Sequence, residues 1–270
     1  MRVPFQISSS GKELAGIFHI SGKQREIPVV LIMCYGLNGN RSEQHRMCVK
    51  LGELCEKNAI NIVRFDYADT GISEGDFYFT NISVRIRNVV DIYDFVSGCF
   101  GGKLLVYLAG FSDGAKIVIN AKEYIDKLQG IVLWNPIINI PKEAAVEKEL
   151  QKISKKMKLH KKYRKPYKQL FGLCMNPMLI SELKYDNSAE KLNDNLQKLF
   201  IFGEEDRFTK KIKEYIEECG FHNVSISIIK EAGHLFGSTV MERQVNDITV
   251  KWIQEQESKF ETKRQRLEKR

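Results

Sequence analysis

Short apolar runs typical of strands alternate with segments whose apolar residues recur at helical spacing, and this alternation restricts the possible fold more than any other feature. The strand-like runs are VVLIMC (29–34), INIVRFDY (60–67), KLLVYLAG (103–110), GIVLWNP (130–136), LQKLFIFG (196–203) and NVSISIIK (223–230). The helix-like segments span 45–58, 82–100, 115–128, 210–220 and 245–260. Such alternation predicts an α/β fold with a mainly parallel sheet and helices on both faces. Two further runs, 3–8 and 14–20, predict an opening hairpin, which brings the sheet to about eight strands.

One segment breaks the alternation. Residues 141–194 are highly charged and helix-prone, and they lie between the strand ending in WNP and the strand containing LFIFG. We expect a helical, basic cap inserted above the carboxyl ends of the strands, where open α/β sheets bind ligands. Because 270 residues suit one large domain, we expect a core of residues 1–140 and 195–258, the cap at 141–194, and a basic tail at 259–270.

The stretch LAGFSDGAK, residues 108–116, places Ser112 between two spaced glycines at a predicted strand-to-helix turn. In this setting Gly-x-Ser-x-Gly forms a nucleophile elbow, a turn too sharp for side chains at Gly110 and Gly114. The turn lifts the serine hydroxyl above the edge of the sheet. The pattern alone is weak, so its weight comes from the strand before it and the helix after it.

A nucleophilic serine needs a base to take its proton and a carboxylate to orient that base. His234, in KEAGHLFG, and Asp206, in IFGEEDRF, each follow a predicted core strand. Both therefore reach the same sheet edge as Ser112, and the order Ser, Asp, His is the one expected for this fold. Glu204 or Glu205 could supply the acid instead. We favour Asp206, because its position after the glycine turn leaves room for the carboxylate to reach back.

Acyl transfer also needs hydrogen-bond donors aimed at the developing oxyanion. The sequence CYGLNGN, directly after the run 29–34, offers a glycine-permitted turn whose backbone N–H at Leu37 can face Ser112. The second donor would be the N–H of Asp113, at the N-terminus of the following helix. An ordinary turn is the alternative interpretation of this stretch, since Asn and Gly suit positive φ.

Residues 35–77, together with GFSDGA, GEED and GHLF, resemble the α/β-hydrolase superfamily, and within it the cinnamoyl/feruloyl esterase and serine-aminopeptidase-like group. The resemblance covers nearly the whole chain. The residues that match the group's motifs are Gly36, Gly39, Asn40, Arg64, Phe65, Asp66, Gly71, Ser73 and Gly75. It implies Ser112 as nucleophile, Asp206 as acid, His234 as base, and Leu37 and Asp113 as oxyanion donors.

The sequence departs from that group in three places. Tyr35 stands where the group usually has His, Ala68 and Asp69 replace the usual Arg-Gly, and Asp113 is an uncommon successor to the nucleophile. Both oxyanion donors are backbone groups, so no departure removes a catalytic atom. The departures weaken any transfer of substrate preference.

Charge and composition bear on partners and location. The net charge is +8, and Lys155 to Gln169 forms a dense basic run. We expect a small-molecule ester or thioester substrate. At this basic cap we also expect an acidic carrier protein or an anionic ligand. A nucleic-acid partner is disfavoured, because no recognition motif accompanies the run.

No apolar run approaches the ~20 residues of a membrane helix. Scattered cysteines and the lack of a secretory signal predict a cytoplasmic protein without a metal site or cofactor.

These observations favour a serine hydrolase that cleaves a carboxylic ester through an acyl-enzyme. Two alternatives stay open. A thioesterase or acyltransferase would use the same triad with a carrier-protein or anionic acyl donor. A non-catalytic binding module of the same fold would need a broken triad.

Overall fold

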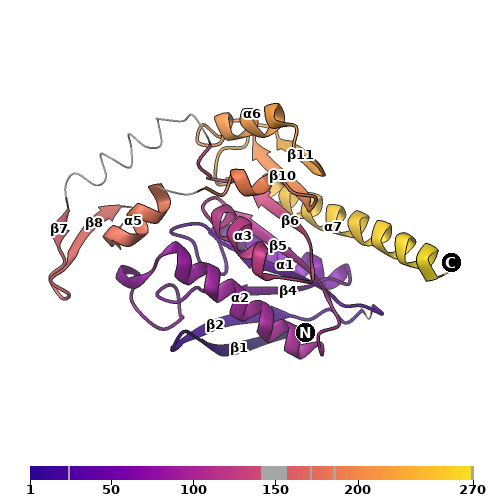
Figure 1. Cartoon of the computed structure of the whole chain (residues 1–270), viewed down its shortest axis with the longest axis horizontal. Coiled ribbons are helices and arrows are strands. Elements are labelled where there is room, and N and C mark those ends of the chain that lie inside the picture. Colours follow the sequence, from indigo (N-terminus) through magenta and orange to yellow (C-terminus); the bar gives the residue numbers. More distant parts are fainter. Residues whose placement is uncertain (24, 141–156, 171, 185–186, 269–270) are drawn as a thin grey trace.

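A computed structural model describes residues 1–23, 25–140, 157–170, 172–184 and 187–268, and within them eight strands form one sheet (Figure 1). Their order across the sheet is β1-β2-β4-β3-β5-β6-β10-β11. Their bounds are β1 Arg2–Ser9, β2 Lys12–His19, β3 Val29–Cys34, β4 Asn61–Phe65, β5 Leu105–Phe111, β6 Leu128–Trp134, β10 Gln197–Gly203 and β11 Val224–Ile229.

Strands β3, β4, β5, β6, β10 and β11 pair in parallel, whereas β1 and β2 form an antiparallel hairpin joined antiparallel to β4. Every residue of β3 and β5 is buried, as expected for central parallel strands covered on both faces. The predicted α/β class with a mainly parallel sheet of about eight strands is therefore confirmed.

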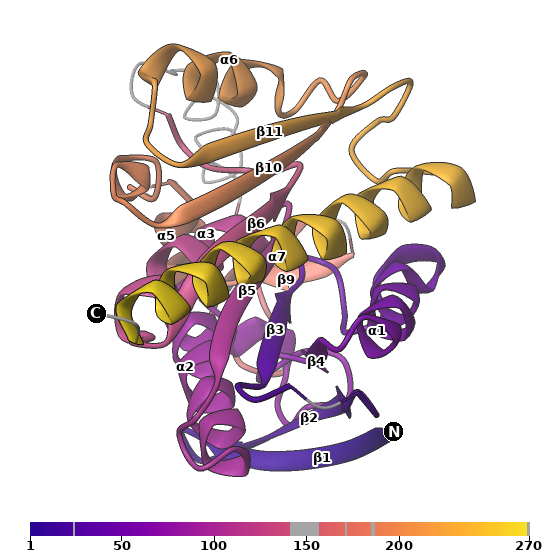
Figure 2. The ribbon, with the colours of Figure 1, turned by 90° about the vertical axis from the view of Figure 1, so that its right-hand side faces the viewer.

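Helices cover both faces of this sheet (Figure 2). Helices α2 (Ile82–Cys99), α3 (Gly114–Ala121) and α6 (Lys210–Cys219) pack on one face. On the other face lie α1 (Met47–Lys57) and the long α7 (Thr239–Glu268), which begins six residues earlier than the sequence predicts. Helix α7 fits closely, because a Cβ at Gly130 in β6 would lie 2.8 Å from the Trp252 ring. Among the described residues, no helix combines the length and apolar character needed to cross a bilayer.

The insertion contains more strand than the sequence predicts. Its described residues form a small antiparallel sheet followed by short helices, with bounds β7 Lys158–Leu159, β8 Pro166–Leu170, β9 Leu173–Met175, α5 Pro177–Lys184 and the 3₁₀ helix η4 Glu190–Leu192. The lysine-rich sequence favours helix by propensity. Pro166, however, lacks an N–H, and Gly172, with φ 79°, makes the turn between β8 and β9. Residues 141–156 of the predicted cap lie outside the described residues.

Aromatic and polar contacts join this small sheet to the body. The Tyr163 hydroxyl donates to Asp76 Oδ2 at 2.8 Å, and the Tyr78 hydroxyl donates to the Pro166 carbonyl at 3.1 Å. The two tyrosine rings stack with centroids 5.2 Å apart. The Asn176 amide donates to the carbonyls of Tyr78 and Thr80. The insertion thus packs on the segment just before α2.

Candidate active site

Ser112 occupies the sharp turn between β5 and α3. Its φ is 54°, in the left-handed region that costs a non-glycine residue free energy. The flanking glycines are required by close approach: a Cβ at Gly110 would lie 2.7 Å from the Gly114 carbonyl oxygen, and one at Gly114 would lie 2.5 Å from the Cys34 carbonyl oxygen. The turn therefore has the geometry of a nucleophile elbow.

Two more predicted side chains meet the serine. Ser112 Oγ lies 2.8 Å from His234 Nε2, and His234 Nδ1 lies 2.7 Å from Asp206 Oδ2. The His234 ring is held between Phe111, which stacks on it with centroids 5.7 Å apart, and the edge of Phe208. The fold thus brings residues from three separate loops into one hydrogen-bonded chain.

Asp206 is the carboxylate of this chain, and it is almost fully buried. It also accepts hydrogen bonds from the Thr209 hydroxyl at 2.8 Å and the Phe208 N–H at 2.9 Å. Burial alone would raise the pKa of Asp206, but the contacts with His234 and these two donors outweigh it and lower the pKa. Glu204 and Glu205 are exposed and make no contact with His234.

The side chain of Asn135 joins the two loops that carry the acid and the base. Its Nδ2 donates to the carbonyls of Gly233 and His234, and its Oδ1 accepts from the Gly203 N–H at 2.7 Å. Sequence reasoning missed Asn135, which it treated only as the end of a strand. The Asn-Pro pair at the end of the run 130–136 was the available signal.

The loop after β3 passes over the serine. A Cβ at Gly36 would lie 3.1 Å from Ser112 Cβ and 3.6 Å from its Oγ, so a larger residue would crowd the hydroxyl. Leu37 follows directly and is buried, and Asp113 stands at the N-cap of α3. Both predicted oxyanion donors therefore belong to backbone that borders Ser112.

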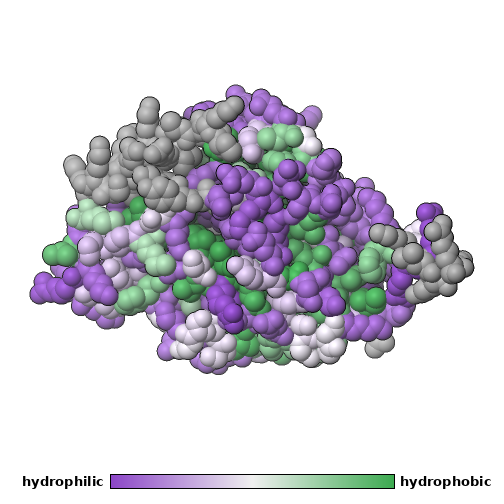
Figure 3. All heavy atoms as spheres, viewed as in Figure 1, coloured by the Kyte–Doolittle hydropathy of each residue, from purple (hydrophilic) through white to green (hydrophobic). Residues whose placement is uncertain are grey.

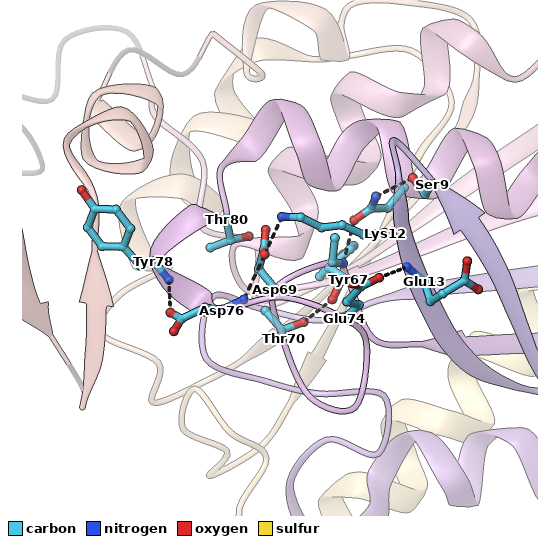
Figure 4. A network of polar contacts seen from close by, with 12 residues as sticks. Ser9, Lys12, Glu13, Tyr67, Asp69, Thr70, Glu74, Asp76, Tyr78 and Thr80 are labelled. Atoms are coloured by element: carbon cyan, nitrogen blue, oxygen red, sulfur yellow. Dashed lines mark hydrogen bonds and ion pairs between the residues drawn. The ribbon is translucent and has the colours of Figure 1, made fainter. Parts of the chain in front are cut away.

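Asp66, one of the residues behind the family resemblance, links this loop to the one after β4. It accepts from the N–H groups of Arg41 and Ile72 and forms an ion pair with Arg41. The next part of the chain is held by a separate network, in which Asp69 accepts from Lys12 and the Asp76 N–H (Figure 4). The loops around the serine are thus fixed by buried carboxylates.

A small cavity of about 140 Å³ opens at the serine. Its lining residues are Gly36, Asn38, Gly39, Asn40, Glu43, Gln44, Ser112, His234 and Leu235. None of the described cations of the basic run lines it, and Lys158, Lys161 and Lys162 are exposed to solvent. In the part of the chain that the structure describes, no three His, Cys, Asp or Glu side chains are grouped to hold a metal ion.

Glu43 is a buried carboxyl that lines this cavity, and sequence reasoning did not single it out. Its Oε1 has no hydrogen-bond partner among the described residues and lies over Gly39, where a Cβ would be only 2.1 Å away. Burial raises the pKa of Glu43 to about 7, although the backbone N–H groups of Gly36 and Gln44 and the charge of His234 partly oppose this.

Comparisons with known proteins place this geometry in a fold class. The chain resembles Est1E from Butyrivibrio proteoclasticus, solved with ferulic acid bound, with a TM-score of 0.76 and 15% identity over 94% of this chain and 99% of that one. It also resembles an esterase from Pyrococcus furiosus (TM-score 0.66, 16% identity, 94% and 91% covered). A third similar structure is the dienelactone hydrolase from Anabaena variabilis (TM-score 0.65, 14% identity, 94% and 97% covered).

These neighbours show that the chain has the α/β-hydrolase fold, as the resemblance in sequence implies. No protein-family model matches the chain. A search of curated proteins also found no match.

Proposed function

We propose that this protein is a serine hydrolase that cleaves a carboxylic ester through an acyl-enzyme. The observation that carries the proposal is the hydrogen-bonded chain from Ser112 through His234 to Asp206, at a strained turn beside a small cavity. The esterases among the structural neighbours support the same reaction class. None of the described cations of the basic run lines the cavity, so an anionic group of a substrate or carrier protein would meet them only outside it.

In the acylation step, His234 Nε2 takes the proton of Ser112 Oγ as the oxygen attacks the ester carbonyl carbon. The carbonyl oxygen becomes an oxyanion, which accepts hydrogen bonds from the Leu37 and Asp113 N–H groups. The imidazolium then donates its proton to the alcohol oxygen, the ester C–O bond breaks, and Ser112 keeps the acyl group. Asp206 holds the His234 Nδ1–H and stabilises the imidazolium, and it stays ionised throughout.

Water resolves the acyl-enzyme by the same route. His234 Nε2 takes a proton from water, the hydroxyl oxygen attacks the acyl carbon, and a second oxyanion forms at the same donors. The proton returns from His234 to Ser112 Oγ as the acid leaves. The hydrolysis therefore consumes one water per ester and leaves the protein unchanged.

The test is covalent labelling of the full-length chain by a fluorophosphonate, followed by turnover of p-nitrophenyl esters of increasing acyl length. We expect the wild type to label and Ser112→Ala to lose both labelling and turnover. Ester hydrolysis that survives in Ser112→Ala, or labelling at another serine, would contradict the proposal.

The identity of the acid is tested separately by amide substitutions. We expect Asp206→Asn to lower turnover by about 10³- to 10⁴-fold, because the amide no longer holds the correct His234 tautomer. Glu204→Gln and Glu205→Gln are matched controls in the same loop and should keep wild-type turnover. A loss in either control equal to that of Asp206→Asn would reassign the acid.

A further inference from the structure

Arg85, in helix α2, is an arginine whose side chain is buried beneath the loop that covers Ser112. It is 1% exposed. Its Nη2 donates to the Leu37 carbonyl at 3.1 Å, its Nη1 to the Gly36 carbonyl at 3.4 Å, and its Nε to the Thr80 hydroxyl at 3.3 Å. The guanidinium therefore binds the backbone of the predicted oxyanion loop directly.

The environment of this cation lacks the usual counter-ion. Among the described residues, no carboxylate forms an ion pair with Arg85. The ring of Tyr67 lies 5.0 Å from the guanidinium carbon and that of Phe77 lies 5.9 Å away, so π faces and carbonyl oxygens replace water. A buried cation without a carboxylate is costly.

The contacts around Arg85 are themselves fixed. Tyr67 and Thr80, which touch it, belong to the segment held by the network around Asp69 (Figure 4). The Thr80 carbonyl also accepts from Asn176 of the insertion. These contacts fix the position of the guanidinium. Its hydrogen bonds therefore fix the position of the Gly36 and Leu37 carbonyls.

Peptide geometry links this contact to the serine. In a trans peptide the C=O and the following N–H point in opposite directions. Since the Gly36 carbonyl points at Arg85, the Leu37 N–H points away from the guanidinium. A Cβ at Gly36 would lie 3.1 Å from Ser112 Cβ, and Gly36 and Asn38, the neighbours of Leu37, both line the cavity at the hydroxyl. The peptide that carries the Leu37 N–H therefore lies beside Ser112.

We propose that Arg85 is the positioning residue of the oxyanion hole: it binds the Gly36 and Leu37 carbonyls, fixes the Leu37 N–H, and adds a buried positive charge behind the oxyanion. This inference rests on the proposed function, because it assumes that a tetrahedral oxyanion forms at Ser112. Hydrogen bonds in a chain polarise one another, so the guanidinium bound to the Gly36 carbonyl strengthens the Leu37 N–H of the same peptide. The negative charge that develops on the oxyanion in the transition state is attracted by Arg85, whereas the neutral ester of the ground state carries no such charge.

The test compares Arg85→Met, Arg85→Lys and the wild type as full-length proteins. We measure kcat and KM for p-nitrophenyl butyrate, and inhibition by phenylboronic acid, whose tetrahedral adduct on a serine carries the charge of the oxyanion. We expect Arg85→Met to lower kcat about 10- to 100-fold with little change in KM, since one preorganised donor is weakened rather than removed. The inhibition constant of the boronic acid should rise by the same factor as kcat/KM falls.

Arg85→Lys keeps the charge but cannot bind both carbonyls with one ammonium, so its losses should fall between those of the wild type and Arg85→Met. If Arg85→Met does not fold, the kcat and boronic acid affinity of Arg85→Lys test the proposal instead. Wild-type kcat and boronic acid affinity in a folded variant would overturn the proposal. So would a lower kcat with unchanged boronic acid affinity.

Lys198 offers a control in strand β10. It is fully buried, donates to the backbone carbonyls of Asp194, Leu196 and His222, and also forms an ion pair with the Asp194 carboxylate. Lys198→Met therefore also removes a buried cation that binds carbonyls, but at the start of β10, whereas the Asp206 loop follows the other end of that strand. It should lower the melting temperature and leave kcat unchanged. If kcat of Lys198→Met falls as much as that of Arg85→Met, the loss of any buried cation lowers turnover by destabilising the fold. That result would overturn the proposal.

The outcomes separate this inference from the proposed function. If Ser112→Ala retains ester turnover, the proposed function fails and the oxyanion role of Arg85 fails with it. If turnover depends on Ser112 but not on Arg85, only the present inference fails.

Discussion

Glu43 combines two energetic costs in one residue. Its backbone has φ 53° and ψ 177°, a conformation that is nearly exclusive to glycine, and such a residue persists only where its surroundings hold it. Its carboxyl is buried, and one of its oxygens has no hydrogen-bond partner in the part of the chain that the structure describes. The backbone strain and the buried carboxyl of Glu43 both destabilise the fold. Because both occur beside Ser112, they indicate that this loop serves the candidate site rather than stability.

The titration of Glu43 predicts a pH dependence of stability. Because its pKa is raised from about 4.5 to about 7 in the folded chain, the fold favours the protonated carboxyl. Its contribution is complete below about pH 4.5 and is lost as pH rises through 7. The charged or titratable groups that influence it are His234 and the Cys48 thiol.

We therefore expect the melting temperature of the wild type to fall more between pH 5 and pH 8 than that of Glu43→Gln, which cannot ionise. Thermal unfolding followed by circular dichroism at several pH values measures this difference. Glu205→Gln, which removes an exposed carboxyl, should keep the wild-type slope. Equal slopes in Glu43→Gln and the wild type would contradict the prediction.

At the residue scale, the sequence predicts groups whose neighbours along the chain reveal them. Ser112 lies between glycines at a strand end, and Asp206 and His234 each follow a strand, so local pattern and strand order place all three. Arg85, Asn135 and Glu43 act through contacts with backbone from distant elements. The spacing of residues along the chain does not predict contacts of this kind. An arginine in an amphipathic helix, in particular, is expected on the surface from its sequence alone.

At the element scale, the hairpin of β7 and β8 presents a basic surface without acidic residues. Residues 157–170 contain no Asp or Glu and six Lys or Arg, namely Lys158, Lys161, Lys162, Arg164, Lys165 and Lys168. Through Tyr163 the hairpin also contacts Asp76, an acidic residue of the body. At the end of the molecule where Figure 1 places this hairpin, Figure 3 shows hydrophilic residues at the tip beside pale and hydrophobic ones. The mutual repulsion of the hairpin's cations is a cost that an anionic partner or substrate would relieve.

Reversing the charge of two lysines in this hairpin should change kcat/KM for anionic substrates only. Exposed charges interact over a Debye length of ~8 Å at physiological salt. We expect Lys161→Glu with Lys162→Glu to lower kcat/KM for an ester with an anionic acyl group, and to remove its salt dependence. For a neutral ester both quantities should stay unchanged.

The control for this prediction carries the same change in net charge at another place. Lys251→Glu with Lys259→Glu alters two exposed lysines of α7, which should affect neither substrate. Equal salt dependence for neutral and anionic esters in the wild type would leave the hairpin as a solvated surface without a role in capture.

The strands were predictable as elements, and the insertion was not. A parallel strand covered on both faces must be apolar throughout, so β3 and β5 stand out in the sequence. The insertion owes its strands to contacts with the body, such as Tyr163 on Tyr78, which override the helix propensity of lysine. In the described part of the insertion, reasoning from composition therefore predicted the short helices but not the three short strands.

At the scale of the whole molecule, one residue of β6 joins the candidate site to the helix that covers one face of the sheet. Trp134, the last residue of β6, accepts at its carbonyl from the Ser112 N–H at 2.9 Å and donates from its ring to the Thr249 hydroxyl of α7 at 3.0 Å. The serine and the long C-terminal helix are thus joined through one buried residue. Loss of the packing of α7 should disturb Ser112 directly.

This coupling predicts that activity and core packing are lost together on heating. The chain has two tryptophans, and Trp252→Phe leaves Trp134 as the only one. The substitution is mild, because Phe keeps an aromatic ring against Tyr107 and removes an indole N–H that has no hydrogen-bond partner among the described residues. We expect the fluorescence of Trp134, the far-ultraviolet circular dichroism and the residual ester hydrolysis of Trp252→Phe to change at one temperature, as a single cooperative transition requires. Activity lost several degrees below the change in fluorescence would show instead that the loops around Ser112 open before the sheet unfolds, and that Trp134 does not couple α7 to the site.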